Sequence, residues 1–136
     1  MANMNAYVMF NGNCREAFEF YKSCFNGQLT LQTVGESPVA AQWPAETHNR
    51  VLHTMLTKDS LILMGSDFMD SGTSYSVGNA ISLCLVCSSH EEIQSLFATL
   101  GEGGKVNHPL KEEFFGTFGD LTDKFGITWM FQFGAM

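Results

Sequence analysis

The sequence is short of charge, and above all of positive charge. Charged residues make up 15% of the 136 residues, against about 25% in an average globular domain. Seven Lys and Arg stand against 14 Asp and Glu, which gives a formal net charge of −7. Nucleic acids and anionic membrane surfaces both attract clustered cations. Because the chain has no basic run, we expect neither nucleic acid nor a membrane as its partner.

Long apolar runs and a recognisable targeting signal are also missing. The apolar stretch 61–64 is far shorter than the roughly 20 residues that a membrane span requires. Residues 1–6 contain neither the basic segment nor the apolar segment of a signal peptide. These features predict a cytoplasmic protein.

Cysteine is scarce, and its spacing does not complete a redox or zinc site. Cys84 and Cys87 have CxxC spacing, but they lie in an apolar stretch that is typical of a strand. Residues three apart on a strand point to opposite faces. No second pair of Cys or His completes a zinc site. We expect Cys14, Cys24, Cys84 and Cys87 to be reduced and mostly packed thiols.

Apolar side chains, by contrast, are plentiful. Hydrophobic residues make up 45% of the chain and include 12 Phe and 8 Met. A length of 136 residues fits one domain with a sizeable core. The excess of Phe and Met indicates extensive buried surface, a concave apolar pocket, or both.

Two helices are predicted by their period. The first begins after Asn13, a good N-cap, and ends near Gly27. The second begins at Ser88 or Ser89 with a capping-box pattern and ends at Gly101. Apolar stripes follow both helices, at Cys14, Ala17, Phe18, Tyr21, Cys24 and Phe25 in the first and at Ile93, Leu96, Phe97 and Leu100 in the second.

The remaining chain is typical of strands separated by polar or glycine-containing turns. The predicted order is βαβββ followed by a second βαβββ, in modules of about 4–66 and 78–134. We expect one domain, 1–136, because each half alone leaves its sheet half covered. The predicted strands are 5–11, 28–34, 50–57, 60–65, 79–87, a weak one near 104–108, 114–121 and 127–133, with irregular stretches at 36–49 and 66–78.

Three segments resemble a known family in their order along the chain. They are Phe10-Asn-Gly-Asn-Cys-Arg-Glu-Ala-Phe-Glu-Phe-Tyr21, Gly65-Ser-Asp67, and Phe118-Gly-Asp-Leu-Thr-Asp-Lys-Phe-Gly-Ile-Thr-Trp-Met130. The sequence resembles the PhnB-like family of the glyoxalase/bleomycin-resistance/dioxygenase (vicinal oxygen chelate) superfamily, whose members often carry a demethylubiquinone methyltransferase label. The resemblance implies an α+β fold, with two paired βαβββ modules forming a curved, cup-shaped mixed sheet and helices on its outer face.

The resemblance also implies where a metal would bind. Metal-dependent relatives take ligands from the first and last strands of each module. The matching positions here are Ala6, Leu63, Ile81 and Met130, and none of them is a ligand for a hard or borderline divalent ion. We therefore expect no metal and no cofactor. Methyl transfer is disfavoured, because a methyl-donor nucleotide usually sits at a glycine-rich turn in a parallel sheet.

Two polar residues are the main candidates for a site. His53, in a predicted strand, could act as an acid or base in the cup, or form a structural hydrogen bond. Asp67, just past a strand end, could receive a polar ligand group or cap a loop. The two lie on neighbouring strands and could meet, which makes them the candidate catalytic pair.

Other candidates come from strand alternation and loop position. In the last strand, alternation places Thr128 and Met130 on the cup face and Trp129 in the core. Tyr75 could reach over a pocket from its loop. Asp120 and Asp123 are interpreted as turn residues, and three further histidines, His48, His90 and His108, as surface residues.

The leading hypothesis is a protein that binds a small, largely apolar molecule in the cup without a metal. The alternative is a lyase or isomerase that acts on a small oxygenated substrate through His53 and Asp67. A third class is a structural or partner-binding dimer. A homodimer is expected in every case, because paired-module proteins of this superfamily commonly form one.

Overall fold

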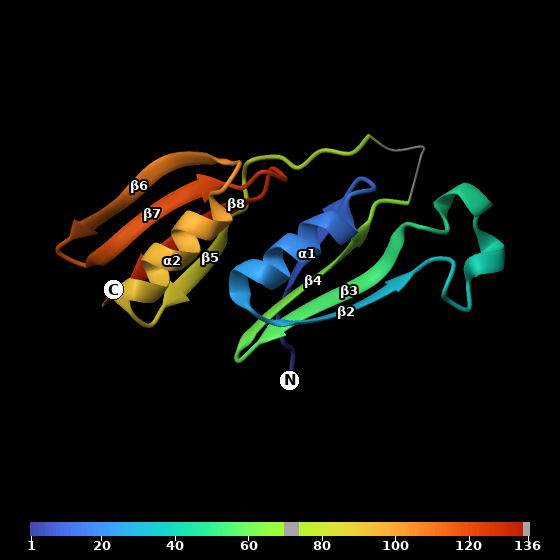
Figure 1. The fold of residues 1–136 in the computed structure, drawn as a ribbon, viewed down its shortest axis with the longest axis horizontal. Coiled ribbons are helices and arrows are strands. Elements are labelled where there is room, and N and C mark those ends of the chain that lie inside the picture. The colour runs from blue at the N-terminus through green and yellow to red at the C-terminus, as the bar shows by residue number, and fades with distance from the viewer. Residues whose placement is uncertain (70–73, 135–136) are drawn as a thin grey trace. The chain divides into compact units, whose positions relative to one another are not determined.

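The chain folds into two compact α+β units, Met1–Tyr75 and Ser76–Met136. They are seen in a computed structural model that describes residues 1–69 and 74–134. Each unit has the predicted order βαβββ (Figure 1). The first contains β1 (Ala6–Phe10), α1 (Cys14–Phe25), β2 (Gln28–Thr33), β3 (Val51–Lys58) and β4 (Leu61–Asp67). The second contains β5 (Leu83–Cys87), α2 (His90–Leu100), β6 (Lys105–Glu113), β7 (Gly116–Thr122) and β8 (Thr128–Phe133).

Each unit has a mixed four-stranded sheet with one helix packed on it. The strand orders are β1-β4-β3-β2 and β5-β8-β7-β6. Each sheet has one parallel pair, in which Ala6 lies beside Leu63 and Leu83 beside Trp129. The other neighbours are antiparallel. One face of each sheet therefore contacts its helix, and the other face is called the open face below.

Helix α1 packs on its sheet through an aromatic cluster. Phe18 and Tyr21 are fully buried, and their rings meet the ring of Phe10 from β1 at centroid distances of 6.0 and 6.4 Å. The predicted stripe is thus confirmed. The left-handed residue that ends the helix is Asn26, with φ of 53°, rather than Gly27. Gly27 is needed for a different reason, since a β-carbon there would lie 2.7 Å from the Thr57 carbonyl oxygen.

Helix α2 begins with the predicted capping box. The Ser89 hydroxyl accepts a hydrogen bond from the Glu92 amide, and the Glu92 carboxylate accepts one from the Ser88 amide in return. Leu100 is fully buried, and the Phe97 ring meets the ring of Phe131 from β8 at 5.0 Å.

Two predicted strands differ most in length from those observed. Strand β6 runs on to Glu113 rather than ending near 108, because an edge strand tolerates Pro109, which has no amide hydrogen to donate. Strand β5 begins at Leu83 rather than 79, because β8 begins only at Thr128, one residue before the partner of Leu83. The stretch 36–49 contains two 3-10 turns, Ala40–Gln42 and Ala45–Thr47. Of the stretch 66–78, residues 70–73 lie outside the described residues.

No helix in the described part of the chain is both long and apolar enough to cross a membrane.

Candidate functional site

Asp67 ends β4 on the face that contacts α1. Its side chain is 2% exposed. One carboxylate oxygen accepts hydrogen bonds from the amides of Gly12 and Cys14, at 2.9 and 3.0 Å, and the other accepts one from the Val51 amide at 2.8 Å. Asn13, the predicted N-cap, makes no side-chain capping bond. The Asp67 carboxylate therefore caps α1 from another strand, where its charge also favours the helix N-terminus.

His53 lies on the open face of the same sheet, in β3. Its side chain is exposed, and its ring stacks on the ring of Tyr7 from β1 at a centroid distance of 5.8 Å. Tyr7 Oη and His53 Nδ1 are 3.4 Å apart, which is a long hydrogen bond. A phenol and an imidazole therefore meet at the open face.

His53 and Asp67 do not form the expected pair. Gly65 faces α1, because a β-carbon there would come within 2.6 Å of the Phe18 ring. Asp67 follows two residues later in the same strand and thus shares that face. His53 lies on the opposite face with Tyr7. Their strands are neighbours, as the sequence indicated, but strand alternation separates the two side chains.

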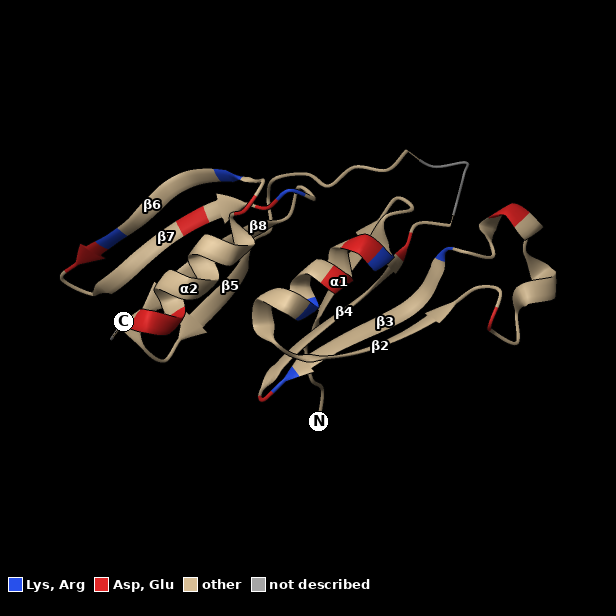
Figure 2. Cartoon of the chain, viewed as in Figure 1, with Lys and Arg blue, Asp and Glu red and all other residues tan. Residues whose placement is uncertain are grey.

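The open face of the first sheet is rich in methionine. Met55 and Met64 are direct cross-strand partners, and Tyr7 lies beside Met64 on the other side. The Ser66 hydroxyl donates to Met9 Sδ at 3.5 Å, which places Met9 on this face as well. Among the four strands only Lys58 and Asp67 are charged, and both lie at strand ends (Figure 2). We call Tyr7, Met9, His53, Met55, Ile62 and Met64 the methionine face.

Tyr75 is held against β1. Its hydroxyl donates to the Met9 carbonyl oxygen at 2.7 Å, and its ring lies 5.9 Å from that of Phe68. Burial, and then the negative charge of Asp67, raise the pKa of Tyr75 above its usual value. The neutral phenol is therefore a stable donor, and its bond to the Met9 carbonyl holds Tyr75 against β1.

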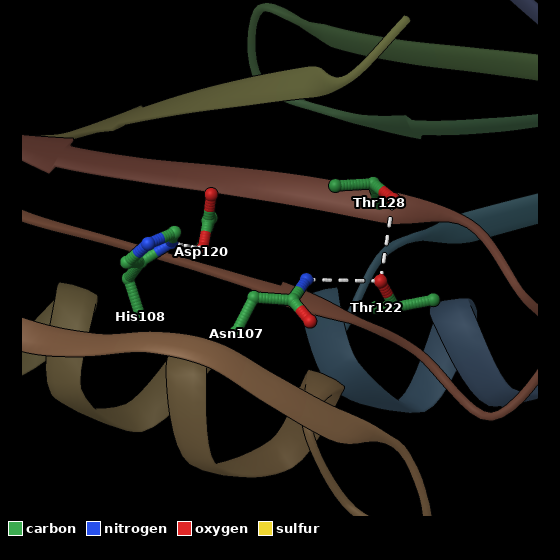
Figure 3. Close-up of polar contacts among 5 residues, drawn as sticks. All are labelled: Asn107, His108, Asp120, Thr122 and Thr128. Atoms are coloured by element: carbon green, nitrogen blue, oxygen red, sulfur yellow. Dashed lines mark hydrogen bonds and ion pairs between the residues drawn. The ribbon is translucent and has the colours of Figure 1, made fainter. Parts of the chain in front are cut away.

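Thr128 lies on the open face of the second sheet with a group of polar side chains from β6 and β7. Its hydroxyl oxygen is 3.3 Å from that of Thr122, which accepts a hydrogen bond from Asn107 Nδ2 at 3.0 Å. Close by, His108 Nδ1 is 2.8 Å from an Asp120 carboxylate oxygen (Figure 3).

This polar group corrects one interpretation made from the sequence, since Asp120 belongs to β7 rather than to a turn. His108 is exposed, as expected of a surface residue, and it is paired with Asp120 across the two strands. The pair was missed because the strand near 104–108 was a weak prediction, so His108 had no expected neighbour. Strand alternation could have predicted that Asp120 and Thr122 share one face of β7, since they are two residues apart.

The other predicted residues of this unit lie where expected. Met130 is the cross-strand partner of Asp120. Trp129 is 2% exposed, and its indole donates to the buried Asp123 carboxylate at 2.8 Å. Asp123 also accepts from the amides of Phe125 and Ile127, as a turn aspartate does.

The remaining histidines and the cysteines have mainly structural surroundings. His48 Nε2 lies 2.8 Å from the Ala40 carbonyl oxygen within the 36–49 stretch, so this residue ties the stretch together. Burial and the charge of Asp67 raise the pKa of the Cys14 thiol to about 12. Burial, with smaller effects of Glu92 and Cys84, raises that of Cys87 to about 11. Cys84 is exposed, so the two thiols of the CxxC spacing lie on opposite faces.

The strand register shows where the positions expected for metal ligands lie. Ala6 and Leu63 are partners, but Leu63 is buried towards α1. The open-face pair one residue later is Tyr7 and Met64. In the second unit Ile81 precedes β5, and the open-face partner of Met130 is Cys84. Neither pair, the phenol and thioether of the first unit or the thiol and thioether of the second, supplies the imidazole and carboxylate groups that suit a hard or borderline divalent ion. Within the described residues no three His, Cys, Asp or Glu side chains gather as a metal site.

Comparison with known proteins identifies a family. A family model described as 3-demethylubiquinone-9 3-methyltransferase matches residues 2–132. Protein YjdN of Escherichia coli is 32% identical, over 93% of this chain and 92% of its own length. The crystal structure of protein PA1353 from Pseudomonas aeruginosa is 35% identical, with full coverage of both chains and a TM-score of 0.88.

Two further solved structures are similar to this chain. A putative 3-demethylubiquinone-9 3-methyltransferase, PhnB protein, from Bacillus cereus is 25% identical, over 98% of this chain and 100% of that one, with a TM-score of 0.77. A glyoxylase/bleomycin resistance protein/dioxygenase domain from Frankia sp. EAN1pec is 13% identical, over 98% and 93%, with a TM-score of 0.68. The latter shows a shared fold.

Proposed function

Since the chain belongs to the 3-demethylubiquinone-9 3-methyltransferase family, the PhnB-like branch of the glyoxalase superfamily, we propose that it binds a small, largely apolar molecule without a metal. The observation that carries this proposal is the methionine face. A cytoplasmic location remains part of the proposal.

The composition of the methionine face supports an apolar ligand. Tyr7, Met9 and Ile62 are 45%, 41% and 40% exposed within the described chain, which is unusual for three large apolar side chains on one sheet face. Methionine side chains are flexible and polarisable, and they adapt to ligands of different shape. Covering such a face releases about 25 cal/mol for each Å² of apolar surface removed from water.

The Tyr7–His53 contact supports a ligand with one polar group. Ligand sites are typically apolar with a few placed polar groups that fix orientation. The phenol and imidazole can each donate or accept a hydrogen bond. A small aromatic or alicyclic molecule with one oxygen or one N–H group would match both parts of the face.

Methionine methyl NMR can test this proposal directly. With methyl-¹³C methionine, titration with phenol, 1-naphthol and indole should shift the methyl signals of Met9, Met55 and Met64. Met1 and Met4 lie outside the strands and are exposed, so their signals are internal controls. Met64→Lys should weaken binding roughly tenfold or more, since it places a charge in the apolar contact, whereas Met4→Lys should not. Shifts that are absent, or confined to other methionines, would overturn the proposal.

The alternative, a lyase or isomerase using His53 and Asp67, receives less support. The contacts of Asp67 favour a structural role, which leaves Tyr7 as the group beside His53. The alternative then predicts loss of turnover, rather than loss of folding, in a His53→Gln variant. Methyl transfer is less favoured than either, because the only glycine of the β1–α1 turn is Gly12 and the parallel strands of each sheet are not joined by a single helix.

Elemental analysis tests the metal-free part of the proposal. Protein purified without an affinity tag should carry well under one equivalent of zinc, iron, nickel or manganese, because among the described residues no three His, Cys, Asp or Glu side chains gather to hold such an ion. Near one equivalent per chain, lost on His53→Ala, would contradict the strand register on which the argument rests.

A further inference from the structure

We propose that the open face of the second sheet carries a proton-transfer centre for small neutral carbonyl compounds with an acidic C–H bond. His108 is its base, Asp120 positions that base, and the Asn107–Thr122–Thr128 chain binds the carbonyl oxygen (Figure 3). This activity goes beyond the ligand binding proposed for the methionine face and depends on none of its residues.

The His108–Asp120 contact has the geometry of an oriented imidazole. The two residues are partners in the β6–β7 ladder, and Nδ1 lies 2.8 Å from the carboxylate oxygen. With the Nδ1 hydrogen donated to the carboxylate, the lone pair is on Nε2. The Asp120 side chain is 21% exposed and that of His108 is 75% exposed. The partly buried carboxylate thus anchors the ring and leaves Nε2 accessible to a substrate.

The Thr122 and Thr128 hydroxyls can donate one hydrogen bond to a ligand. Asn107 donates to Thr122, so the Thr122 and Thr128 hydroxyls share one hydrogen bond between them. Two hydroxyls have two hydrogens, and their shared bond uses only one. The remaining hydrogen can be donated to a carbonyl oxygen. No other side-chain contact of these hydroxyls occurs among the residues that the structure describes.

The spacing of the two parts suits a small molecule. Asp120 and Thr122 are two residues apart on β7, so their side chains stand about 7 Å apart on one face. A carbonyl oxygen at hydrogen-bond distance from a hydroxyl then has its α-carbon within reach of His108. Met130, the partner of Asp120 in β8, adds an apolar side chain to the same sheet face.

The chemistry that follows is proton abstraction next to a carbonyl. His108 Nε2 takes the proton, the C–H electron pair forms a carbon–carbon double bond, and the carbonyl π pair moves onto the oxygen held by the hydroxyl. The Asp120 carboxylate stabilises the imidazolium. Return of the proton to the same carbon gives exchange. In a hydroxycarbonyl compound, return of the proton to the former carbonyl carbon gives isomerisation, when the hydroxyl proton of the first carbon moves to the enolate oxygen and the first carbon becomes the new carbonyl. Both outcomes balance without an oxidant or a reductant.

Hydrogen exchange measures the first step. Hydroxyacetone and dihydroxyacetone are incubated with the protein in D₂O, and loss of their C–H signals is followed by ¹H NMR. General base catalysis typically contributes about 10²–10⁴-fold, so we expect exchange at least about tenfold faster with the parent protein than with His108→Gln. His90→Gln is the matched control and should retain the parent rate. Equal rates for the parent and His108→Gln overturn the proposal.

The roles of Asp120 and Thr128 are tested separately. Asp120→Asn should slow exchange at saturating substrate and shift the His108 ring ¹⁵N signals away from the Nδ1–H tautomer, with Asp120→Glu restoring both in part. Thr128→Val should mainly raise the KM. Thermal melting of each variant shows whether it has folded. A folded Asp120→Asn protein with parent exchange and an unchanged tautomer would refute the positioning role.

Discussion

Asp67 organises the start of the first unit, since its carboxylate accepts hydrogen bonds from the amides of Gly12, Cys14 and Val51. These amides come from the β1–α1 turn, from the first residue of α1 and from the first residue of β3. One charged side chain therefore connects three elements, and both of its oxygens are used.

Replacing this carboxylate by an amide should be costly. Asp67→Asn keeps one acceptor oxygen but turns an NH₂ group towards a backbone N–H. A hydrogen bond to a charged group is worth about 1.5–3 kcal/mol, so we expect the free energy of unfolding to fall by roughly 3 kcal/mol. Urea denaturation followed by circular dichroism measures it.

Asp59→Asn is the matched control. Asp59 lies in the exposed β3–β4 turn with φ of 53°, a conformation that Asn adopts readily. Its stability should change by less than about 0.5 kcal/mol. If Asp67→Asn unfolds at the same urea concentration as Asp59→Asn, the carboxylate is not the anchor described above.

Asp67 also shows which part of the site could not be predicted from the sequence. His53 and Asp67 could be selected from the sequence, because polar residues in apolar strands stand out. Their separation follows from which face each strand turns to α1, and this depends on register. Register also decides which face the expected ligand positions share, since Ala6 pairs with Leu63, which is buried towards α1, and Tyr7 pairs with Met64 on the open face.

At the scale of elements, the phenylalanine rings that pack the two helices differ in how deeply they are buried. Phe18 is fully buried, Phe97 is half-buried, and Phe114, in the β6–β7 turn, is fully exposed. Aspartate at Phe18 would place an unpaired charge in the core, which costs more than about 4 kcal/mol. Phe97→Asp should cost less, because its carboxylate can partly reach water.

Thermal melting of the three Asp variants compares their stabilities. Phe114→Asp should melt like the parent, Phe97→Asp lower, and Phe18→Asp lowest or not fold at all. Phe18→Leu, a milder change, covers the last case and should still lower the melting temperature. A Phe18→Leu protein as stable as the parent would contradict the packing of α1.

The elements themselves were largely predictable from sequence. Amphipathic stripes and the Ser89 capping box are local signals, and both helices lie where these signals placed them. Strand β6 was the weakest prediction, because an edge strand with Pro109 and little burial has no alternation to detect. Because β6 carries His108, the weak prediction of this strand is the reason that the His108–Asp120 pair was not predicted.

At the scale of the whole molecule, we expect a homodimer. Ile81, Val86 and Phe114 are 81%, 73% and 100% exposed in the second unit. Exposed apolar residues of this size favour association with a second copy. Multi-angle light scattering across micromolar concentrations should give a mass near twice 15.0 kDa. A mass near 15 kDa over the whole range would refute the dimer.

The parallel pairing of β1 with β4 also determines the order in which the first unit can fold during synthesis on the ribosome. Ala6 finds its partner only when Leu63 has left the exit tunnel, and α1 gains its capping carboxylate only with Asp67. Closing so long a segment makes this a high-contact-order step, which is slow compared with forming a helix or a hairpin. The β2–β3–β4 meander is able to form before it, whereas β1 has no partner strand until β4 is complete. During translation β1 is therefore exposed to chaperones for longer than the β2–β3–β4 meander.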